Sequence, residues 1–202
     1  VYATLAIRSA GAGIQTPAVG ALLPQIVPAP ALMRVNGINM SNGASLSVEN
    51  CVVSNFPGGG RRGLFVGTAA TIRIVNSLFR DNHDGALISG GATASISESQ
   101  FFGSTDLAVW VSDQVGSGVT TTAHVDRSVA SGSGGGFAAQ TAYAGNRTRL
   151  FVSNSVASNN SSAGVMSYAP LGNAYVSVRS TEVSGNANSG LYVSGAGAKL
   201  VA

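Results

Sequence analysis

Apolar and polar residues alternate in short runs from about residue 35 to the end of the chain. Alternation with a period of two predicts a β-strand that buries one face. The runs recur every 22 to 29 residues, roughly, which is the spacing of a repeat architecture. The first runs of the repeats are "LSVENCVVSN" from Leu46, "IRIVNSLFRDN" from Ile72, "ASISESQFFG" from Ala94, "AHVDRSVASG" from Ala123, "LFVSNSVASN" from Leu150 and "VSVRSTEVSGN" from Val176.

When the repeats are aligned, their residues form columns. Two columns are almost purely aliphatic and are predicted to point inward: Leu46, Ile72, Ala94, Ala123, Leu150 and Val176, then Val48, Ile74, Ile96, Val125, Val152 and Val178. A column of small residues follows: Cys51, Ser77, Ser99, Ser128, Ser155 and Thr181. After a polar turn, each repeat ends in a run such as "GLFVG" from Gly63, with Leu64 and Val66 predicted inward and the later repeats reaching Leu191 and Val193. Three strands per repeat, stacked about 4.8 Å apart, predict an all-β parallel solenoid.

The recurring patterns "V-x-V-x-N-S" and "G-[LV]-x-V" give the chain a family resemblance. Residues 35–202 resemble the right-handed parallel β-helix family, the superfamily of pectate lyases and of many bacterial secreted repeat proteins. The resemblance implies a β-helix of six to seven three-strand coils and an extracellular or cell-surface location. It leaves the function open, because function depends on sites built onto a fold.

The chain is predicted to have two parts. Residues 1–34 contain an initial strand near "TLAIRS" and a Pro-rich stretch, 11–33, which is expected to cap the first coil or cover one face. Residues 35–202 form the β-helix. The closing "GAKLVA" repeats the opening of a coil, so the last coil is expected to be incomplete.

Composition narrows the choice of partners. Only 9% of the residues are charged, and the net charge of +3 comes from cations scattered without a basic block. Nucleic acid is therefore not an expected partner. No apolar run reaches the length of about 18 residues that a membrane-spanning helix needs, so no membrane span is predicted. The single cysteine, Cys51, gives no information about the redox compartment.

The stretch "RDNHDG", Arg80 to Gly85, concentrates charge in this sparsely charged chain. Other coils place polar turns such as "SNNSSAG" here, and Asn, Asp and Gly favour turns, so the stretch is explained as a corner. It also resembles the "DPHD" motif of mannuronan C5-epimerases, with Asn82 in place of the proline. Stacking of coils is expected to bring Arg62 and Asp106 beside His83 and Asp84. These four residues are the candidates for acid–base chemistry or cation binding.

The carboxylates on the strand faces are more dispersed. Glu49, Glu98 and Asp126 are separated by column or by coil, unlike the clustered aspartates of the calcium-dependent lyases. Glu98 is predicted to pair with Arg127. No metal site and no cofactor are predicted, and His124 is assigned no role.

The outward column of the last strand is unusually apolar for a solvated face. It contains Phe65, Leu87, Trp110, Ala138, Met166 and Tyr192. An exposed apolar stripe indicates a contact surface, and aromatic rings can stack on sugar rings or pack against protein. The alternative is an internal cover, with residues 11–33 lying over the stripe.

Taken together, the residues favour a non-catalytic extracellular module with a structural, surface-attachment or glycan- or protein-binding role. Self-association through the open last coil or the aromatic stripe is a further expectation, with a polysaccharide as the other expected partner. The alternative is a polysaccharide-active enzyme, a uronate lyase or C5-epimerase, with its site near the turn formed by residues 81–84.

Overall fold

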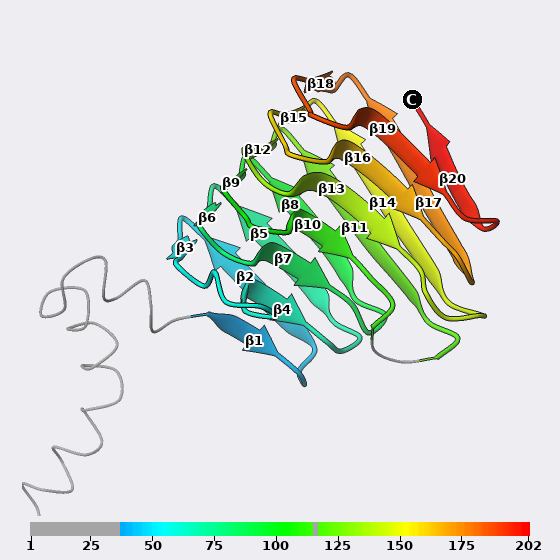
Figure 1. The fold of residues 1–202 in the computed structure, drawn as a ribbon. Coiled ribbons are helices and arrows are strands. Elements are labelled where there is room, and N and C mark those ends of the chain that lie inside the picture. The colour runs from blue at the N-terminus through cyan, green and yellow to red at the C-terminus, as the bar shows by residue number, and fades with distance from the viewer. Residues whose placement is uncertain (1–36, 115–116) are drawn as a thin grey trace, which may run out of the picture. The chain divides into compact units, whose positions relative to one another are not determined.

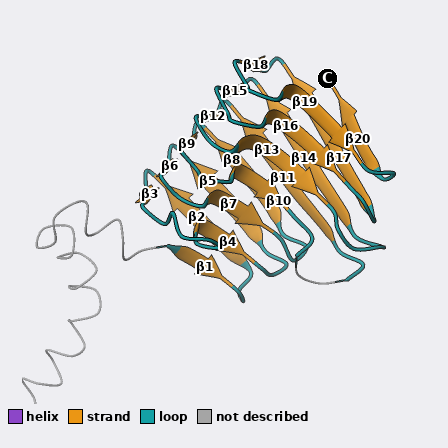
Figure 2. Ribbon diagram, in the orientation of Figure 1, coloured by secondary structure: helices purple, strands orange, loops and turns teal. Residues whose placement is uncertain are grey.

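The computed structural model describes residues 37–114 and 117–202. These residues form twenty strands and no helix, and the strands coil into a parallel solenoid (Figures 1 and 2). Since the described part contains no helix, it contains no membrane-spanning helix. The predictions for residues 1–34 lie outside the described residues.

Three parallel sheets make up the solenoid, and each coil contributes one strand to each sheet. Sheet A consists of β1 (Ile38–Met40), β4 (Arg62–Val66), β7 (Asp84–Ile88), β10 (Leu107–Val111), β13 (Gly135–Gln140), β16 (Ala163–Tyr168) and β19 (Ser189–Ser194). Sheet B consists of β2 (Ser45–Glu49), β5 (Thr71–Val75), β8 (Thr93–Ser97), β11 (Thr120–Asp126), β14 (Arg147–Ser153), β17 (Asn173–Arg179) and β20 (Ala198–Val201). Sheet C consists of β3 (Val52–Ser54), β6 (Leu78–Arg80), β9 (Gln100–Phe102), β12 (Val129–Ser131), β15 (Val156–Ser158) and β18 (Glu182–Ser184).

The core lies inside the coil, where the predicted columns meet. The register pairs Ile74 with Ile96, and both side chains are fully buried. Inside sheet C, the rings of Phe79 and Phe101 stack with their centroids 5.0 Å apart. The prediction of a parallel β-solenoid is therefore confirmed, with burial stabilising each coil against its neighbours.

The inward columns lose their burial at the two ends of the described solenoid. Leu46 in the first complete coil is partly exposed, and Leu191 and Val193 on β19 are 41% and 49% exposed. These positions carry the inward pattern, but only one neighbouring strand pairs with β19 within the described residues.

The corner between sheets B and C is built the same way in every complete coil. One residue adopts a left-handed backbone, with φ between 45° and 54°, and these residues are Asn50, Asn76, Glu98, Arg127, Asn154 and Ser180. The residue that follows belongs to the predicted small-residue column. The hydroxyl of Ser99 accepts a hydrogen bond from the N–H of Ser77 in the preceding coil, and Ser128 and Ser155 continue this ladder. The small side chains therefore satisfy backbone donors that the turn leaves without partners.

A second left-handed corner separates sheets C and A and positions the "RDNHDG" stretch. Asp81 is its left-handed residue, with φ of 56°. Asn82 comes next and is fully buried. Its side chain accepts from the N–H of Phe56 at 3.2 Å and donates to the carbonyl of Val53 at 3.1 Å. Asp81 and Asn82 are thus corner residues, as the turn interpretation predicted.

Candidate functional site

The candidates Arg62, His83, Asp84 and Asp106, called the His83 cluster below, come from three successive coils. Arg62 begins β4 and pairs in register with Asp84, which begins β7. His83 and Asp106 directly precede β7 and β10, and the N–H of Asp106 donates to the carbonyl of His83 at 2.8 Å. The structure therefore brings all four residues together at the amino-terminal ends of three adjacent strands of sheet A.

Asp84 is the buried centre of the His83 cluster, with 1% of its side chain exposed. Its Oδ2 atom lies 3.1 Å from Nε of Arg62, and its Oδ1 atom accepts a long, 3.5 Å hydrogen bond from the N–H of Leu107. Arg62 also donates to the side chain of Gln114 at 3.3 Å. A buried carboxylate needs such partners, because an isolated buried charge is costly.

His83 and Asp106 are less fully engaged than Asp84. The Nδ1 atom of His83 lies 3.5 Å from Oδ1 of Asp84, and it is buried without a hydrogen-bond partner. Partial burial raises the pKa of the Asp106 carboxyl, and repulsion from the Asp84 carboxylate raises this pKa further. The charge of His83 acts in the opposite direction and lowers it. Ligand atoms of His83, Asp84 and Asp106 all lie within 4.8 Å of one another.

The apolar stripe on sheet A is in register as expected, but Leu87 and Ala138 within it are buried. The register aligns Phe65, Leu87 and Trp110, and Leu87 is fully buried although it lies in the outward column. The Arg62 guanidinium lies 5.1 Å from the centroid of the Phe65 ring, so a long side chain from the His83 cluster covers this end. Leu87 is therefore not accessible to a partner in this structure.

The stripe opens at its C-terminal end, around Met166 and Tyr192. Tyr192 is 40% exposed. A hollow of about 340 Å³ is lined by Gln140, Ser162, Ala163, Met166, Tyr168, Asn188, Ser189 and Tyr192. Tyr192 is the most exposed aromatic residue of the stripe, whereas Phe65 and Trp110 are partly buried.

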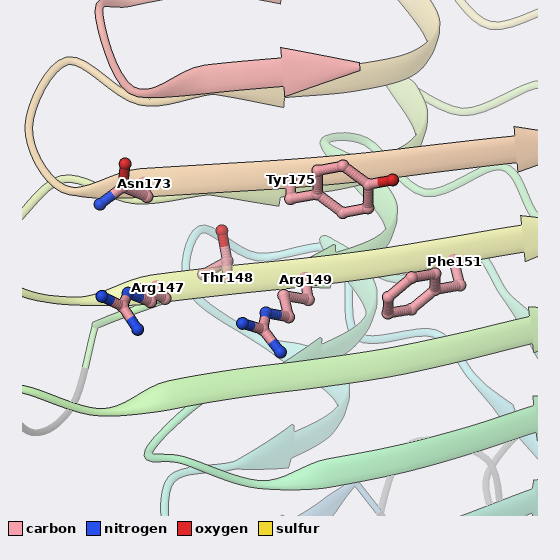
Figure 3. Close-up of a pocket in the computed structure, with 6 residues that line it drawn as sticks. All are labelled: Arg147, Thr148, Arg149, Phe151, Asn173 and Tyr175. Carbon is pink, nitrogen blue, oxygen red and sulfur yellow. The ribbon is translucent and has the colours of Figure 1, made fainter. Parts of the chain in front are cut away.

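A second surface, on the outer face of sheet B, was not predicted from the sequence. A groove of about 380 Å³ is lined by Arg147, Thr148, Arg149, Phe151, Asn173 and Tyr175. Figure 3 shows Arg147, Arg149 and Phe151 along β14 and Asn173 and Tyr175 along the neighbouring β17. We call this surface the Arg149 groove.

The aromatic residues of the Arg149 groove form a connected row. The ring of His124 stacks on that of Phe151 with 4.7 Å between centroids, and Phe151 contacts Tyr175 at 5.9 Å. The ammonium of Lys199 lies 5.9 Å from the Tyr175 ring. His124, to which the sequence assigned no role, thus belongs to the row.

The cations of the Arg149 groove have no internal partners. Within the described residues, neither Arg147 nor Arg149 forms a side-chain hydrogen bond or an ion pair. Earlier on the same sheet, Arg73 of β5 pairs with Glu49. The predicted pair between Arg127 and Glu98 is confirmed, at 3.0 Å.

Sequence comparison supports the architecture. A family model for the right handed beta helix region matches residues 33–201. The chain belongs to the right-handed β-helix family. No curated protein and no solved structure gives a significant match. Membership in the β-helix family shows the fold of this chain but not its function. The function must be argued from the His83 cluster and the Arg149 groove.

The signal for the Arg149 groove was present in the repeats of the β-helix. Residues 147, 149 and 151 alternate with the inward positions of β14, so their side chains must share the outer face. The next coil places Tyr175 directly beside Arg149. The outward residues of sheet B, aligned across coils, therefore carry the signal for the groove.

Proposed function

We propose that the chain is a non-catalytic β-helix module that binds an acidic polysaccharide in the Arg149 groove at a cell surface or outside the cell. One observation carries this proposal. The guanidinium groups of Arg147 and Arg149 lie beside the rings of Phe151 and Tyr175, and they have no partner among the described residues. Guanidinium groups bind carboxylates in a bidentate manner, and aromatic faces stack on sugar rings.

The shape of the surface fits a chain-like ligand. A second hollow of about 380 Å³ shares Phe151 and Tyr175 with the Arg149 groove and continues to Ser177 and Arg179. Together the two hollows follow β14, whose seven residues span about 23 Å at roughly 3.3 Å per residue. Cationic groups flank a central aromatic patch, which suits a ligand that carries carboxylates along a chain of rings.

Affinity electrophoresis with polygalacturonate tests this proposal, with neutral dextran as the comparison ligand. The full chain is expected to bind polygalacturonate, and Arg149→Ala is expected to weaken binding about tenfold or more, since a charge-assisted contact contributes about 1.5–3 kcal/mol. Arg73→Ala is the matched control, because it removes the same charge from the same sheet but from an arginine already paired with Glu49. Equal losses in both variants, or no binding by the full chain, would exclude the Arg149 groove.

The second candidate function is a uronate lyase or C5-epimerase reaction at the His83 cluster. The raised pKa of Asp106 beside His83 favours it, because a carboxyl tuned in this way suits acid–base work. Arg62 counts against it, since its guanidinium is already paired with Asp84 and is not free to neutralise a uronate. Formation of unsaturated or epimerised uronates by the full chain, lost in His83→Ala, would support the enzyme.

Self-association stays a prediction of its own. Leu191, Val193 and Val201 in the last described coil are 41%, 49% and 44% exposed, which is the surface through which a second copy would stack. Light scattering over micromolar to millimolar concentration, roughly, tests it, and a monomer throughout that range would count against it.

A further inference from the structure

The His83 cluster contains three groups of the kind that ligate metals, from adjacent coils of the β-helix. His83 Nδ1 and Asp84 Oδ1 are 3.5 Å apart. One ligand atom each of His83, Asp84 and Asp106 lies within 4.8 Å of the other two. The Nδ1 atom of His83 is buried and lacks a hydrogen-bond partner within the described residues. In the tautomer protonated at Nε2, this nitrogen offers a lone pair to a cation.

The spacing suits a small tetrahedral cation. With metal–ligand bonds of about 2.0–2.2 Å, two ligands of a tetrahedral zinc ion lie about 3.3–3.6 Å apart. The His83–Asp84 distance falls in this range without any movement. Asp106 is exposed, so rotation of its side chain can bring its carboxylate to bonding distance of the same cation.

The ligand types select among cations. Calcium takes about six to eight oxygen ligands, whereas an imidazole ligand favours zinc and its neighbours. Arg62 holds Oδ2 of Asp84 at 3.1 Å and so leaves Oδ1 directed to His83. An imidazole ligates a metal in its neutral form. In that form, one guanidinium and two carboxylates give the cluster one net negative charge, which attracts a divalent cation.

We propose that His83, Asp84 and Asp106 bind one zinc-class divalent cation, with Arg62 positioning the Asp84 carboxylate. The cation takes the lone pair of His83 Nδ1 and bridges the two carboxylates across adjacent coils. Three protein ligands leave a fourth position for water. This site is independent of the Arg149 groove and of polysaccharide binding.

The test is titration of the metal-free full chain with Co²⁺, followed by its visible absorption, and with Zn²⁺, followed by calorimetry. One equivalent is expected to bind, with the intense visible bands of tetrahedral Co²⁺. Asp106→Asn is the first variant, because this exposed side chain can change without threatening the fold. Loss of a direct ligand is expected to weaken binding by about 100-fold or more, beyond the 10–100-fold typical of outer-shell partners.

His83→Gln and His124→Ala form the matched pair. The chain has two histidines, and His124 lies on the outer face of sheet B, stacked on Phe151. His83→Gln should abolish the Co²⁺ bands while His124→Ala retains them, with circular dichroism confirming that both remain folded. Absence of binding by the full chain, or binding unchanged in both Asp106→Asn and His83→Gln, would overturn the proposal.

Discussion

The His83 cluster and the Arg149 groove use charge in opposite ways. In the cluster, Arg62 neutralises a carboxylate that is 1% exposed, and the neighbouring Asn82 bonds two backbone groups. In the groove, Arg147 and Arg149 extend from a regular strand and form no ion pair within the described residues. Charge at a corner is largely occupied in holding adjacent coils together. The charge of Arg147 and Arg149 on the strand face is available to a ligand, unlike that of Arg73, which is paired with Glu49.

The largest expected effect is a difference in the free energy of unfolding between variants of the His83 cluster and of the Arg149 groove. Asp84→Ala removes the partner of a partly buried guanidinium and is expected to lower the free energy of unfolding by about 3 kcal/mol, the lower end for a broken buried pair. Arg149→Ala should change it by less than about 0.5 kcal/mol. Urea denaturation measures both. Similar losses of unfolding free energy in the two variants would contradict the view that the corner charge stabilises the fold and the strand-face charge does not.

A smaller effect is expected at the corner residue Asn82. Asn82→Ala leaves the N–H of Phe56 and the carbonyl of Val53 without their partner, at a cost of about 2 kcal/mol. Serine occupies the equivalent place in a later coil, where Ser133 accepts from the N–H of Ser104. Asn82→Ser should therefore recover part of the loss in the same denaturation experiment. Full stability of Asn82→Ala would show that this ladder contributes little.

Proton binding gives a third comparison, because the pKa of a carboxyl at the corner and that of a carboxyl on the face of sheet B shift in opposite directions. Burial and the Asp84 charge raise the pKa of Asp106, whereas hydrogen bonds from Asn154 and Ser153 lower the pKa of Asp126 at the end of β11. As pH rises from the unfolded to the folded pKa of Asp106, the folded state binds more protons, so this contribution to stability falls. For Asp126 the contribution is lost as pH falls through its lowered pKa.

Carboxyl carbon NMR titration measures both shifts. Asp106 should titrate above the ordinary range for aspartate and Asp126 below it. In Asp84→Asn the pKa of Asp106 should decrease while that of Asp126 stays unchanged. Coincident titration of the two carboxyls would contradict this account of their surroundings.

The smallest expected effect concerns salt. Polygalacturonate binding in the Arg149 groove should weaken steadily as ionic strength rises, because exposed charges are screened beyond about 8–10 Å at physiological salt. The Arg62–Asp84 pair is largely buried, so the urea midpoint of the full chain should change little over the same range. Affinity electrophoresis and denaturation at matched salt concentrations compare the two. Salt-independent binding would argue for an apolar contact at Phe151 and Tyr175 alone.

The architecture could be predicted from the sequence because burial imposes a period that residues display directly. Ile74 and Ile96, for example, occupy aliphatic columns of the repeat, and both are buried in the core. The corner around Asp81 could also be predicted, since Asn, Asp and Gly tolerate left-handed angles. The proximity of Arg62, His83 and Asp106 followed from stacking alone.

Side-chain direction and cover were harder to predict. Alternation places Leu87 on the outer face, but it cannot show that this side chain is completely buried. The hydrogen bonds of Asn82 depend on the register of the adjacent coil, which the pattern within one run does not contain. The Arg149 groove combines Arg149 and Tyr175 from adjacent coils. These residues lie on a face without apolar periodicity, so the pattern within one run does not predict the groove.

The central claim is that the strand face, and not the corner, receives the polysaccharide. Amide NMR spectra of the labelled full chain, recorded during addition of polygalacturonate oligomers, test it most directly. The account predicts that perturbed signals concentrate at Arg147, Arg149 and Phe151 on β14 and at Tyr175 on β17. Perturbations centred on His83 and Asp106 would contradict it and place the ligand at the corner.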